Sequence, residues 1–289
     1  MSKKTVYFKS TNLLIEEIKK QNNIEILKEP NSLIKLFKKQ TFPDIYFHSG
    51  VLDEKAMKYI ENSKIIIANS FSVKNLIIQK SKLSSEKIEV IYPSINIDYK
   101  NIDELKEKYI EKFDFFPTTK LIFFTAKNFK TSGIKEFLEI CSSITYPDYR
   151  VIIAGSKQQI ANLNFSLTKY SKLKDKLILL EDYKNIDELF LISDIFILPT
   201  QNKTFATNIL KAMFCECVVF LPINNDAKEI IDVYASMERV NDPSTAFKID
   251  AVLYDDRELN KIKIENKERA MECILENNLN KFNQILSQI

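Results

Sequence analysis

The sequence contains little glycine, one histidine and no tryptophan. Glycine accounts for 3 of the 289 residues, whereas an average protein has about 7%. A glycine-rich phosphate loop of either nucleotide-binding type therefore has no place in the chain, which excludes P-loop kinases and ordinary dinucleotide-binding enzymes. The one histidine, His48, also argues against a zinc site, because no second histidine is available as a ligand.

The cysteines form neither the framework of a secreted disulfide protein nor a CxxC pair. The four are Cys141, Cys215, Cys217 and Cys273. We interpret them as small core residues of a protein in a reducing compartment. The N-terminal residues lack the apolar core of a signal peptide, and no apolar run approaches the ~20 residues that span a membrane. We therefore expect a cytoplasmic protein.

Charge gives no reason to expect nucleic acid as a partner. Lys and Arg total 42 and Asp and Glu total 39, so the net charge is only +3. The basic excess lies in residues 1–113. It is either ordinary solvated surface, which is the simpler interpretation, or a face that makes peripheral contact with the inner face of an anionic membrane.

Short apolar runs alternate with amphipathic helical segments along the whole chain. The predicted strands lie at 5–8, 24–27, 43–49, 64–70, 87–93, 120–126, 150–155, 176–182, 194–198 and 217–222. The predicted helices include 12–21, 32–40 with Asn31 as N-cap, 52–62, 73–81, 102–113, 134–143, a long helical region up to Tyr170, 186–192, 206–214, 227–234 and a helical tail from Ala246. Because most strands are apolar on both faces, this alternation predicts an α/β fold with parallel sheets. A turn-rich joint at 114–119 divides it into domains 1–113 and 114–270, followed by a C-terminal helix in 271–289.

The stretch 193–231 is the most informative part of the chain. It reads SDIFILPTQNKTFATNILKAMFCECVVFLPINNDAKEII, which predicts a buried strand, a polar loop, a helix and a second buried strand. The helix expected at 227–234 would carry Glu229 in its first turn, where the helix dipole stabilises a carboxylate. In an open parallel sheet, the loop after a strand and the next helix N-terminus form the usual ligand crevice.

This stretch resembles the donor-site signature of retaining, nucleotide-sugar-dependent glycosyltransferases of the GT-B fold, of the sucrose-synthase and mannosyltransferase type. The family pattern is roughly aDifvlPSxxEpFGxxxlEAMaxGxPVv, and SDIFILPT, Phe205, LKAM and CVVF fall in register with it. The segments IIIANSFSVKNLI and KIEVIYPSINIDY are similar to family segments of the first domain. The resemblance implies two Rossmann-like domains facing each other across a cleft, a shortened N-terminal domain, and a last helix that crosses back to it.

The resemblance also implies where the donor diphosphate binds. The family loop GRxxxxKG aligns with AKNFKTSG at 126–133, so that Lys127 takes the arginine position and Gly133 is retained. Ser132 takes the lysine position, and Lys130 is close enough to replace that lysine. The resemblance thus predicts a diphosphate clamp, although an ordinary surface loop that carries lysines is the alternative.

The two glutamates of the family pattern, eight positions apart, fall on Lys203 and Lys211. In the family they accept hydrogen bonds from the hydroxyls of the donor sugar and of the ribose. An ammonium group has three donors and no acceptor, so both acceptors are lost and the local charge changes by about four units. The two extra cations could still attract a diphosphate or an anionic sugar, and we therefore keep Lys203 and Lys211 among the predicted donor-binding residues. The alternative is that these are surface lysines on a fold that no longer catalyses.

Further candidate groups complete the predicted site. Thr204, Ala206 and Thr207 would present backbone amides and hydroxyls to the donor, together with Phe205, which we also interpret as a core residue. His48 ends a predicted strand, at the place where the family often has a histidine near the anomeric carbon of the donor. The alternative for His48 is a structural histidine.

Two functions agree with these residues. The first is a divergent glycosyltransferase that moves a sugar from a nucleotide-sugar to a glycan, a lipid-linked molecule or a protein. It would need no cofactor, because the family binds the donor phosphates without an essential metal. The second is a catalytically inactive relative that binds a glycan or a nucleotide, or that acts as the partner subunit of another glycosyltransferase.

Overall fold

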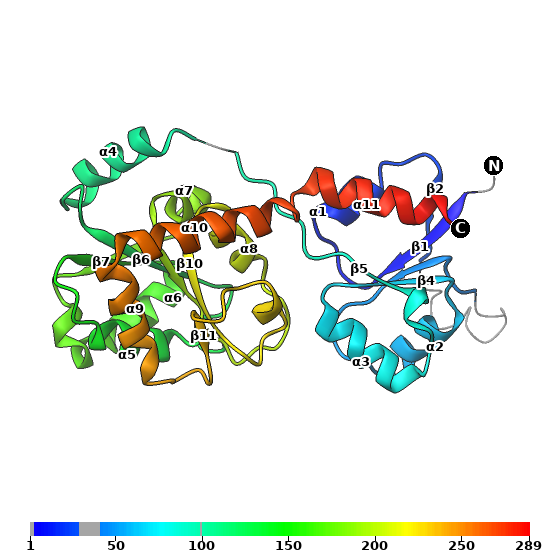
Figure 1. Ribbon diagram of the computed structural model, residues 1–289, viewed down its shortest axis with the longest axis horizontal. Helices are drawn as coiled ribbons and strands as arrows, with labels where there is room; N and C mark the ends of the chain where they lie inside the picture. Colours follow the sequence, from blue (N-terminus) through cyan, green and yellow to red (C-terminus); the bar gives the residue numbers. More distant parts are fainter. Residues whose placement is uncertain (1–2, 29–40, 99) are drawn as a thin grey trace. The chain divides into compact units, whose positions relative to one another are not determined.

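The computed structural model describes residues 3–28, 41–98 and 100–289. The chain folds into two compact units, one formed by Met1–Asn96 with Glu272–Ile289 and the other by Ile97–Met271. Each unit contains one parallel β-sheet with helices on its faces (Figure 1). The α/β architecture expected from the apolar strands is therefore confirmed. The helix expected at 32–40, with its N-cap Asn31, lies outside the described residues.

In the described part of the first unit, the sheet has five strands in the order β2-β1-β3-β4-β5, all parallel. The strands are β1 (Lys4–Phe8), β2 (Ile24–Ile26), β3 (Ile45–Phe47), β4 (Ile65–Ala68) and β5 (Ile88–Val90). The helices formed by its described residues are α1 (Leu13–Ile18), α2 (Glu54–Asn62), α3 (Phe71–Ser81) and α11 (Leu275–Ser287), and a 3₁₀ turn covers Ser85–Lys87. The side chains of Asn12, Asp53 and Ser70 cap α1, α2 and α3 by accepting a backbone N–H, which is why these helices begin where they do.

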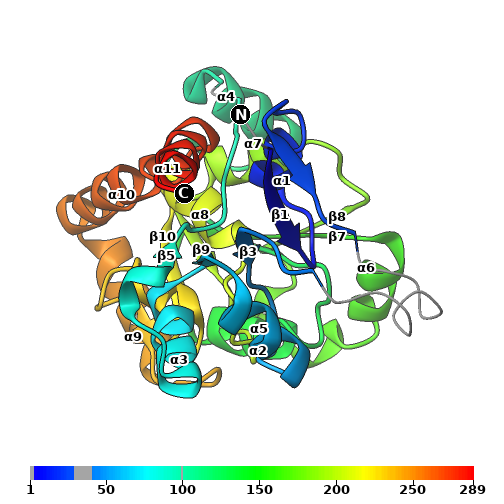
Figure 2. The ribbon, with the colours of Figure 1, turned by 90° about the vertical axis from the view of Figure 1, so that its right-hand side faces the viewer.

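Helices α1 and α11 cover one face of this sheet, and α2 and α3 cover the other (Figures 1 and 2). Ile15 and Ile18 of α1 and Phe282 of α11 belong to one buried cluster with strand residues. Tyr7, Tyr46 and Tyr59, whose rings stack with centroids 4.4–5.9 Å apart, belong to the cluster on the other face. Because the short strands carry apolar side chains on both faces, helices cover the sheet on both sides.

The C-terminal helix packs with the first unit. The amide side chain of Asn278 donates to the carbonyl of Tyr92 at 3.0 Å and to the hydroxyl of Ser94 at 2.8 Å. Just before the helix, Ile274 forms a parallel bridge with Ile95. These contacts group residues 272–289 with the N-terminal strands, although they are separated from them by the whole second unit in sequence.

The sheet of the second unit has six strands in the order β11-β10-β9-β6-β7-β8, again all parallel. The strands are β6 (Lys120–Thr125), β7 (Tyr149–Gly155), β8 (Leu177–Glu181), β9 (Ile195–Ile197), β10 (Val218–Pro222) and β11 (Ser236–Met237). The helices are α4 (Ile102–Phe113), α5 (Ile134–Ser143), α6 (Lys157–Asn164), α7 (Ile186–Ile192), α8 (Thr207–Phe214), α9 (Ser244–Tyr254) and α10 (Asp256–Met271). The strand order reverses between β6 and β9, which is the order of doubly wound nucleotide-binding sheets.

Three details of this unit differ from the expectations. A 3₁₀ turn at Asp226–Glu229 replaces the helix expected at 227–234, so that Glu229 ends a short turn and does not lie in the first turn of a helix. The helical region expected to reach Tyr170 stops at Asn164 and continues as 3₁₀ turns. Strand β11, with only two residues, was not expected, because a strand so short has no periodicity to detect.

Helix α4 is anchored to α7 of the same unit, whereas the expected domain boundary at 113/114 grouped it with the N-terminal part of the chain. Glu188 of α7 is 5% exposed. It accepts hydrogen bonds from Lys100 at 2.6 Å, Lys108 at 2.9 Å and Tyr109 at 2.6 Å. Burial by itself raises the pKa of Glu188, but these hydrogen bonds outweigh burial and hold the pKa at about 2.

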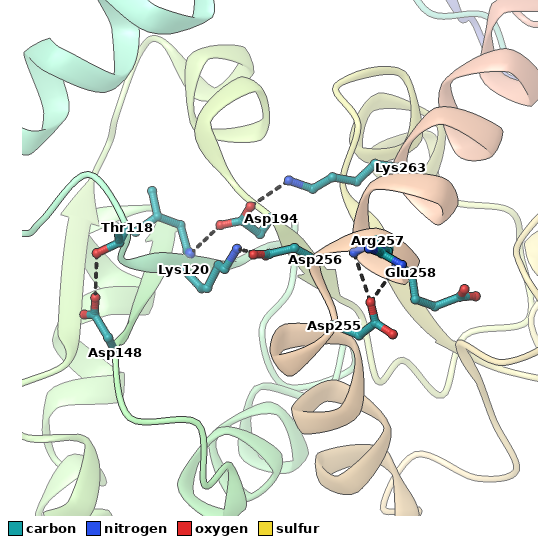
Figure 3. A network of polar contacts seen from close by, with 10 residues as sticks. Thr118, Lys120, Asp148, Asp194, Asp255, Asp256, Arg257, Glu258 and Lys263 are labelled. Atoms are coloured by element: carbon teal, nitrogen blue, oxygen red, sulfur yellow. Dashed lines mark hydrogen bonds and ion pairs between the residues drawn. The ribbon is translucent and has the colours of Figure 1, made fainter.

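Asp194, just before β9, joins three elements at the amino ends of the strands (Figure 3). Its carboxylate accepts the backbone N–H of Leu121 on β6 at 2.9 Å and pairs with Lys263 of α10 at 2.6 Å. Nearby, Lys120 pairs with Asp256 at 2.8 Å, but the side chain of Asp256 is 76% exposed. The Asp194 side chain is 13% exposed, so its contacts contribute more to stability than the exposed pair does.

We expect the change Asp194→Ala to lower the free energy of unfolding by about 2–4 kcal/mol, because it leaves Lys263 and the amide of Leu121 without their buried acceptor. The matched change Asp256→Ala removes an exposed partner and should cost less than about 1 kcal/mol. Urea denaturation of both variants measures the difference. Equal losses would show that burial does not distinguish the two carboxylates.

Glu188 predicts a specific pH dependence of stability. Its folded pKa of about 2 lies below its ordinary value of 4.5, so its stabilisation is fully present above pH 4.5 and is lost as the pH falls to about 2. Relative to the variant Glu188→Gln, the wild-type protein should lose about 1–3 kcal/mol of stability over this range. The loss is limited because Lys100 and Lys108 are half-exposed, so that solvent screens their interaction with Glu188. Denaturation curves at several pH values test this, and a constant difference between the two proteins would contradict it.

Candidate functional site

The topology of the second sheet places a crevice at the carboxyl ends of β6 and β9. Helices α5 and α9 pack on one face of the sheet, and α7, α8 and α10 pack on the other (Figure 1). The loop after β6 leads to α5 and the loop after β9 leads to α8. These two loops therefore separate at the point where the strand order reverses, which is where open α/β sheets bind ligands.

A pocket of about 380 Å³ opens at this point, and we call it the switch-point pocket. It is lined by Thr125, Ala126, Lys127, Ser132, Leu198, Thr200, Asn202, Thr204, Phe205, Ala206, Thr207 and Asn208. Its volume lies within the ~300–1,000 Å³ of typical small-molecule sites. Among these lining residues one is cationic and none carries a carboxylate, so the pocket suits an anionic ligand.

Gly133 fixes the distance between the two loops. Its φ is +82°, and a Cβ atom built on it would lie 1.9 Å from the carbonyl oxygen of Pro199. The carbonyl of Thr131 also accepts the backbone N–H of Gln201 at 3.4 Å and the hydroxyl of Thr200 at 3.3 Å. The predicted site residue Gly133 thus acts here as a spacer, because only glycine permits both the left-handed backbone and the close approach.

The N-terminus of α8 opens into the switch-point pocket. Its N-cap residue, Ala206, has no side chain that could accept a backbone N–H, and the helix therefore begins without a side-chain cap. Thr207, the first residue of the helix, lines the pocket. The first amides of a helix, together with its dipole, favour an anion at this end. The predicted Thr204–Thr207 segment is thus assembled at the pocket, with Phe205 buried.

The structure separates the two lysines of the predicted clamp. Lys127 lines the switch-point pocket, whereas Lys130 does not and instead lines an adjoining groove. Both side chains are exposed, and neither forms an ion pair with any residue in the part of the chain that the structure describes. Lys127 is therefore the cation available to an anion in the pocket.

Lys203 and Lys211 do not line the pocket. Lys203 is exposed, and its backbone carbonyl accepts the N–H of Asp226 at 2.7 Å. Lys211 on α8 pairs with Asp187 in the first turn of α7 at 2.6 Å. The carboxylate of Asp187 therefore neutralises the positive charge of Lys211, which adds no net charge to the site.

His48 lies in the first unit, directly after β3. The order β2-β1-β3 makes this the reversal point of the first sheet. The side chain is buried, and its Nδ1 lies 3.4 Å from the hydroxyl of Tyr46. Its Nε2 has no hydrogen-bond partner among the described residues. Burial lowers the pKa of His48, so the imidazole is neutral at pH 7.

Several pocket residues were not expected as binding groups, notably Asn202, Thr200 and Asn208. The amide of Asn208 donates to the carbonyl of Thr125 at 3.2 Å and so joins α8 to the end of β6. The position of Asn208 in the first turn of a predicted helix after a polar loop is the one sequence signal that could have indicated it. The contact with β6 follows only from the strand order.

Comparison with known proteins agrees with this geometry. A family model described as "Glycosyl transferases group 1" matches residues 105–269. No curated protein sequence matches the chain.

Solved structures share the fold of the whole chain at low sequence identity. HepE of Anabaena, solved in complex with UDP and glucose, is 16% identical to this chain with a TM-score of 0.70. The match covers 85% of this chain and 71% of the HepE chain. Sucrose-phosphate synthase of Thermosynechococcus elongatus is 13% identical, covers 98% and 73%, and has a TM-score of 0.68. WaaG, a glycosyltransferase of lipopolysaccharide biosynthesis, is 12% identical, covers 97% and 99%, and has a TM-score of 0.66. The predicted GT-B fold is thus confirmed.

We expect Gly133→Ala to lower the free energy of unfolding by about 2–5 kcal/mol, because an alanine there meets both the unfavourable φ and the Pro199 carbonyl. Gly50 is the matched control: its φ is +86°, but nothing lies within 4 Å of an added Cβ. Gly50→Ala should therefore cost only about 1–2 kcal/mol. Thermal and urea denaturation compare the two variants. Equal losses of unfolding free energy would show that the close approach to Pro199 does not constrain this position.

Proposed function

The chain belongs to the family of glycosyl transferases group 1, and from this we propose that it transfers a sugar from a nucleotide-sugar donor to an acceptor molecule. The donor diphosphate would bind in the switch-point pocket. The observation that carries this proposal is that the uncapped N-terminus of α8 and the exposed Lys127 border the same space of about 380 Å³. HepE, which shares this fold, was solved with UDP-glucose, which makes uridine nucleotides the first candidates.

Three groups would act on the diphosphate as the bond to the sugar breaks. Negative charge then increases on the leaving phosphate oxygens, and a site preorganised for that charge lowers the barrier. Lys127 would supply a positive charge, and the amides of Thr207 and Asn208 would supply hydrogen bonds at the positive end of the helix dipole. With this charge supplied by the protein, we propose a reaction that uses no metal or other cofactor.

The hydroxyls of the donor need acceptors other than the family glutamates. Lys203 and Lys211 offer no lone pairs, and neither lines the pocket. Thr200, Asn202 and Thr204, whose side chains each carry an oxygen, do line it. We therefore assign them as the donor-binding acceptors, with Lys203 and Lys211 outside the contact. His48 remains the proposed catalytic residue near the reacting carbon, supported by its buried, unpartnered Nε2.

The acceptor is proposed to be a glycan, a lipid-linked molecule or a protein. A lipid-linked acceptor would bring the protein to the cytoplasmic face of a membrane. Helix α3 supports such a contact, because Phe71 and Leu76 are exposed large apolar residues on the same helix as Lys74 and Lys80. Among the described residues, no helix has the length and apolar character that crossing a membrane requires.

A second function is favoured by one observation. None of the residues that line the switch-point pocket carries a carboxylate, so every side-chain acceptor there is neutral. A neutral acceptor binds a sugar hydroxyl less strongly than a charged one does. The chain could thus bind a nucleotide or a glycan without transfer, or act as the partner subunit of another glycosyltransferase.

Nucleotide binding tests the proposed site directly. Calorimetry with UDP, GDP, ADP and UDP-glucose should show binding at millimolar concentration or better for at least one of them. Lys127→Ala should weaken this binding about 10–100-fold, as expected for a charge-assisted hydrogen bond. Lys130→Ala, a neighbouring exposed lysine outside the pocket, should weaken it less than about threefold.

The outcomes separate the hypotheses. If no diphosphate nucleotide binds, the proposed donor site is wrong. If a nucleotide binds equally well to the Lys127→Ala protein, the diphosphate clamp is wrong. If UDP-glucose binds but no UDP is released with glycan, lipid-linked or protein acceptors, the non-catalytic function is favoured.

A further inference from the structure

A second and larger space adjoins the switch-point pocket. It has a volume of about 720 Å³, and we call it the α5–α6 groove. Its walls come from the loop after β6, the first turn of α5, helix α6 with the residues on either side of it, and Gln201 of the loop after β9. Lys127 lines both spaces, whereas the other lining residues of the groove are absent from the pocket.

The groove has a fixed floor. The ring of Phe129 packs beside Gly155, where an added Cβ atom would lie 2.4 Å from the ring. Gln159 of α6 holds the loop after β6 in place, because its amide donates to the carbonyls of Ala126 at 3.3 Å and Lys127 at 3.2 Å. The side-chain oxygen of Gln159 accepts the N–H of Ser156 at 2.9 Å. Gln159 thus joins α6 to the loop after β6, and its hydrogen bonds are made within the protein.

Three side-chain amides of the groove are available to a ligand. Gln158, Asn162 and Gln201 line it, and their side-chain amide groups form no hydrogen bond with other described residues. Each amide combines two N–H donors with a carbonyl acceptor. This combination matches the hydroxyls of a sugar, which both donate and accept.

The charge of the groove is positive. Lys127, Lys130 and Lys135 line it, against the single carboxylate of Glu136. Of these lysines, Lys135 alone forms an ion pair within the described residues, with Glu139 at 3.6 Å, and the Lys135 side chain is 74% exposed. The groove therefore favours a ligand that carries negative charge.

The lining argues against a nucleobase as the occupant. Phe129 is the aromatic residue of the groove and is only 6% exposed, so that it offers no open ring face for stacking. The volume is within the ~300–1,000 Å³ that holds ligands larger than a single small group. Amides with free hydrogen-bonding capacity, an excess of lysines and this volume agree with a short charged sugar chain.

We propose that the α5–α6 groove binds an anionic oligosaccharide, meaning a short sugar chain that carries carboxylate or phosphate groups. Lys130 and Lys135 contact the negative groups, and Gln158, Asn162 and Gln201 contact the hydroxyls. Its shared edge with the donor pocket makes this chain part of the acceptor. That last identification rests on the transferase function proposed above, whereas binding of the chain does not.

The test uses calorimetry on the full chain with trigalacturonic acid as the anionic probe and maltotriose as the neutral one. We expect the anionic trisaccharide to bind at millimolar concentration or better and at least about tenfold more tightly than the neutral one. The double variant Lys130→Gln/Lys135→Gln should weaken its binding about five- to tenfold. Glu136→Gln should strengthen it about twofold, because it removes the one repelling carboxylate.

Two controls make the result specific. Lys174 is also exposed, but it lies before β8 at the amino end of the sheet, so Lys174→Gln should leave binding unchanged. Saturation with UDP should not displace the trisaccharide, and the double variant should bind UDP as the wild type does. A phosphorylated probe, glucose 6-phosphate, then tells whether phosphate serves as well as carboxylate.

The proposal is overturned if the anionic trisaccharide does not bind or binds no better than maltotriose. It is also overturned if Lys174→Gln weakens binding as much as the double variant does, or if UDP displaces the trisaccharide. Loss of nucleotide binding in Lys127→Ala with the trisaccharide still bound would support two separate sites. If nucleotides fail to bind at all while the trisaccharide binds, the proposed donor site is wrong, and the proposed oligosaccharide site in the α5–α6 groove is still supported.

Discussion

The close approach of Gly133 to Pro199 is the constraint on which the candidate site depends. With a Cβ atom at this position, the carbonyl of Pro199 would have to move, since the two would lie 1.9 Å apart. Both loops that border the switch-point pocket meet at this contact, and the same loop after β6 forms one wall of the α5–α6 groove. A chain with only 3 glycines keeps one here and another, Gly155, beneath Phe129. At these two positions a side chain would collide with the Pro199 backbone or with the Phe129 ring, so that only glycine fits.

Ion pairs decide which lysines of this lysine-rich chain can act on a ligand. Lys211 is paired with Asp187, Lys263 with Asp194, and Lys100 and Lys108 share Glu188. These pairs hold helices together and leave little charge available to a ligand. Lys127 and Lys130 belong to the lysines without such a pair in the described part of the chain, and both lie at the carboxyl ends of the strands. Two lysines without an ion pair among the described residues thus lie where parallel sheets bind anions.

Strong periodicity explains why much of the fold was predictable. Helices α4, α5 and α7 begin and end at the expected residues, because each has an apolar face at helical spacing and, in α4, an Asn101 N-cap. The helix expected at 227–234 was wrong, because the structure has a 3₁₀ turn at Asp226–Glu229 that buries Ala227. In the site, the family resemblance predicted Lys127 and Thr207, but not the contact between Asn208 and Thr125, which joins residues 83 positions apart.

The sequence by itself determined the alternation of strands and helices, the burial of the strands and the family resemblance, because these depend on residue type and spacing along the chain. The tertiary structure decided which lysines line the switch-point pocket. Lys203 and Lys211 occupy the positions of the family glutamates in sequence, yet one is exposed outside the pocket and the other is paired with Asp187. Spacing along a helix cannot reveal a partner on a neighbouring helix, and that partner determines whether a lysine binds a phosphate or stabilises the fold.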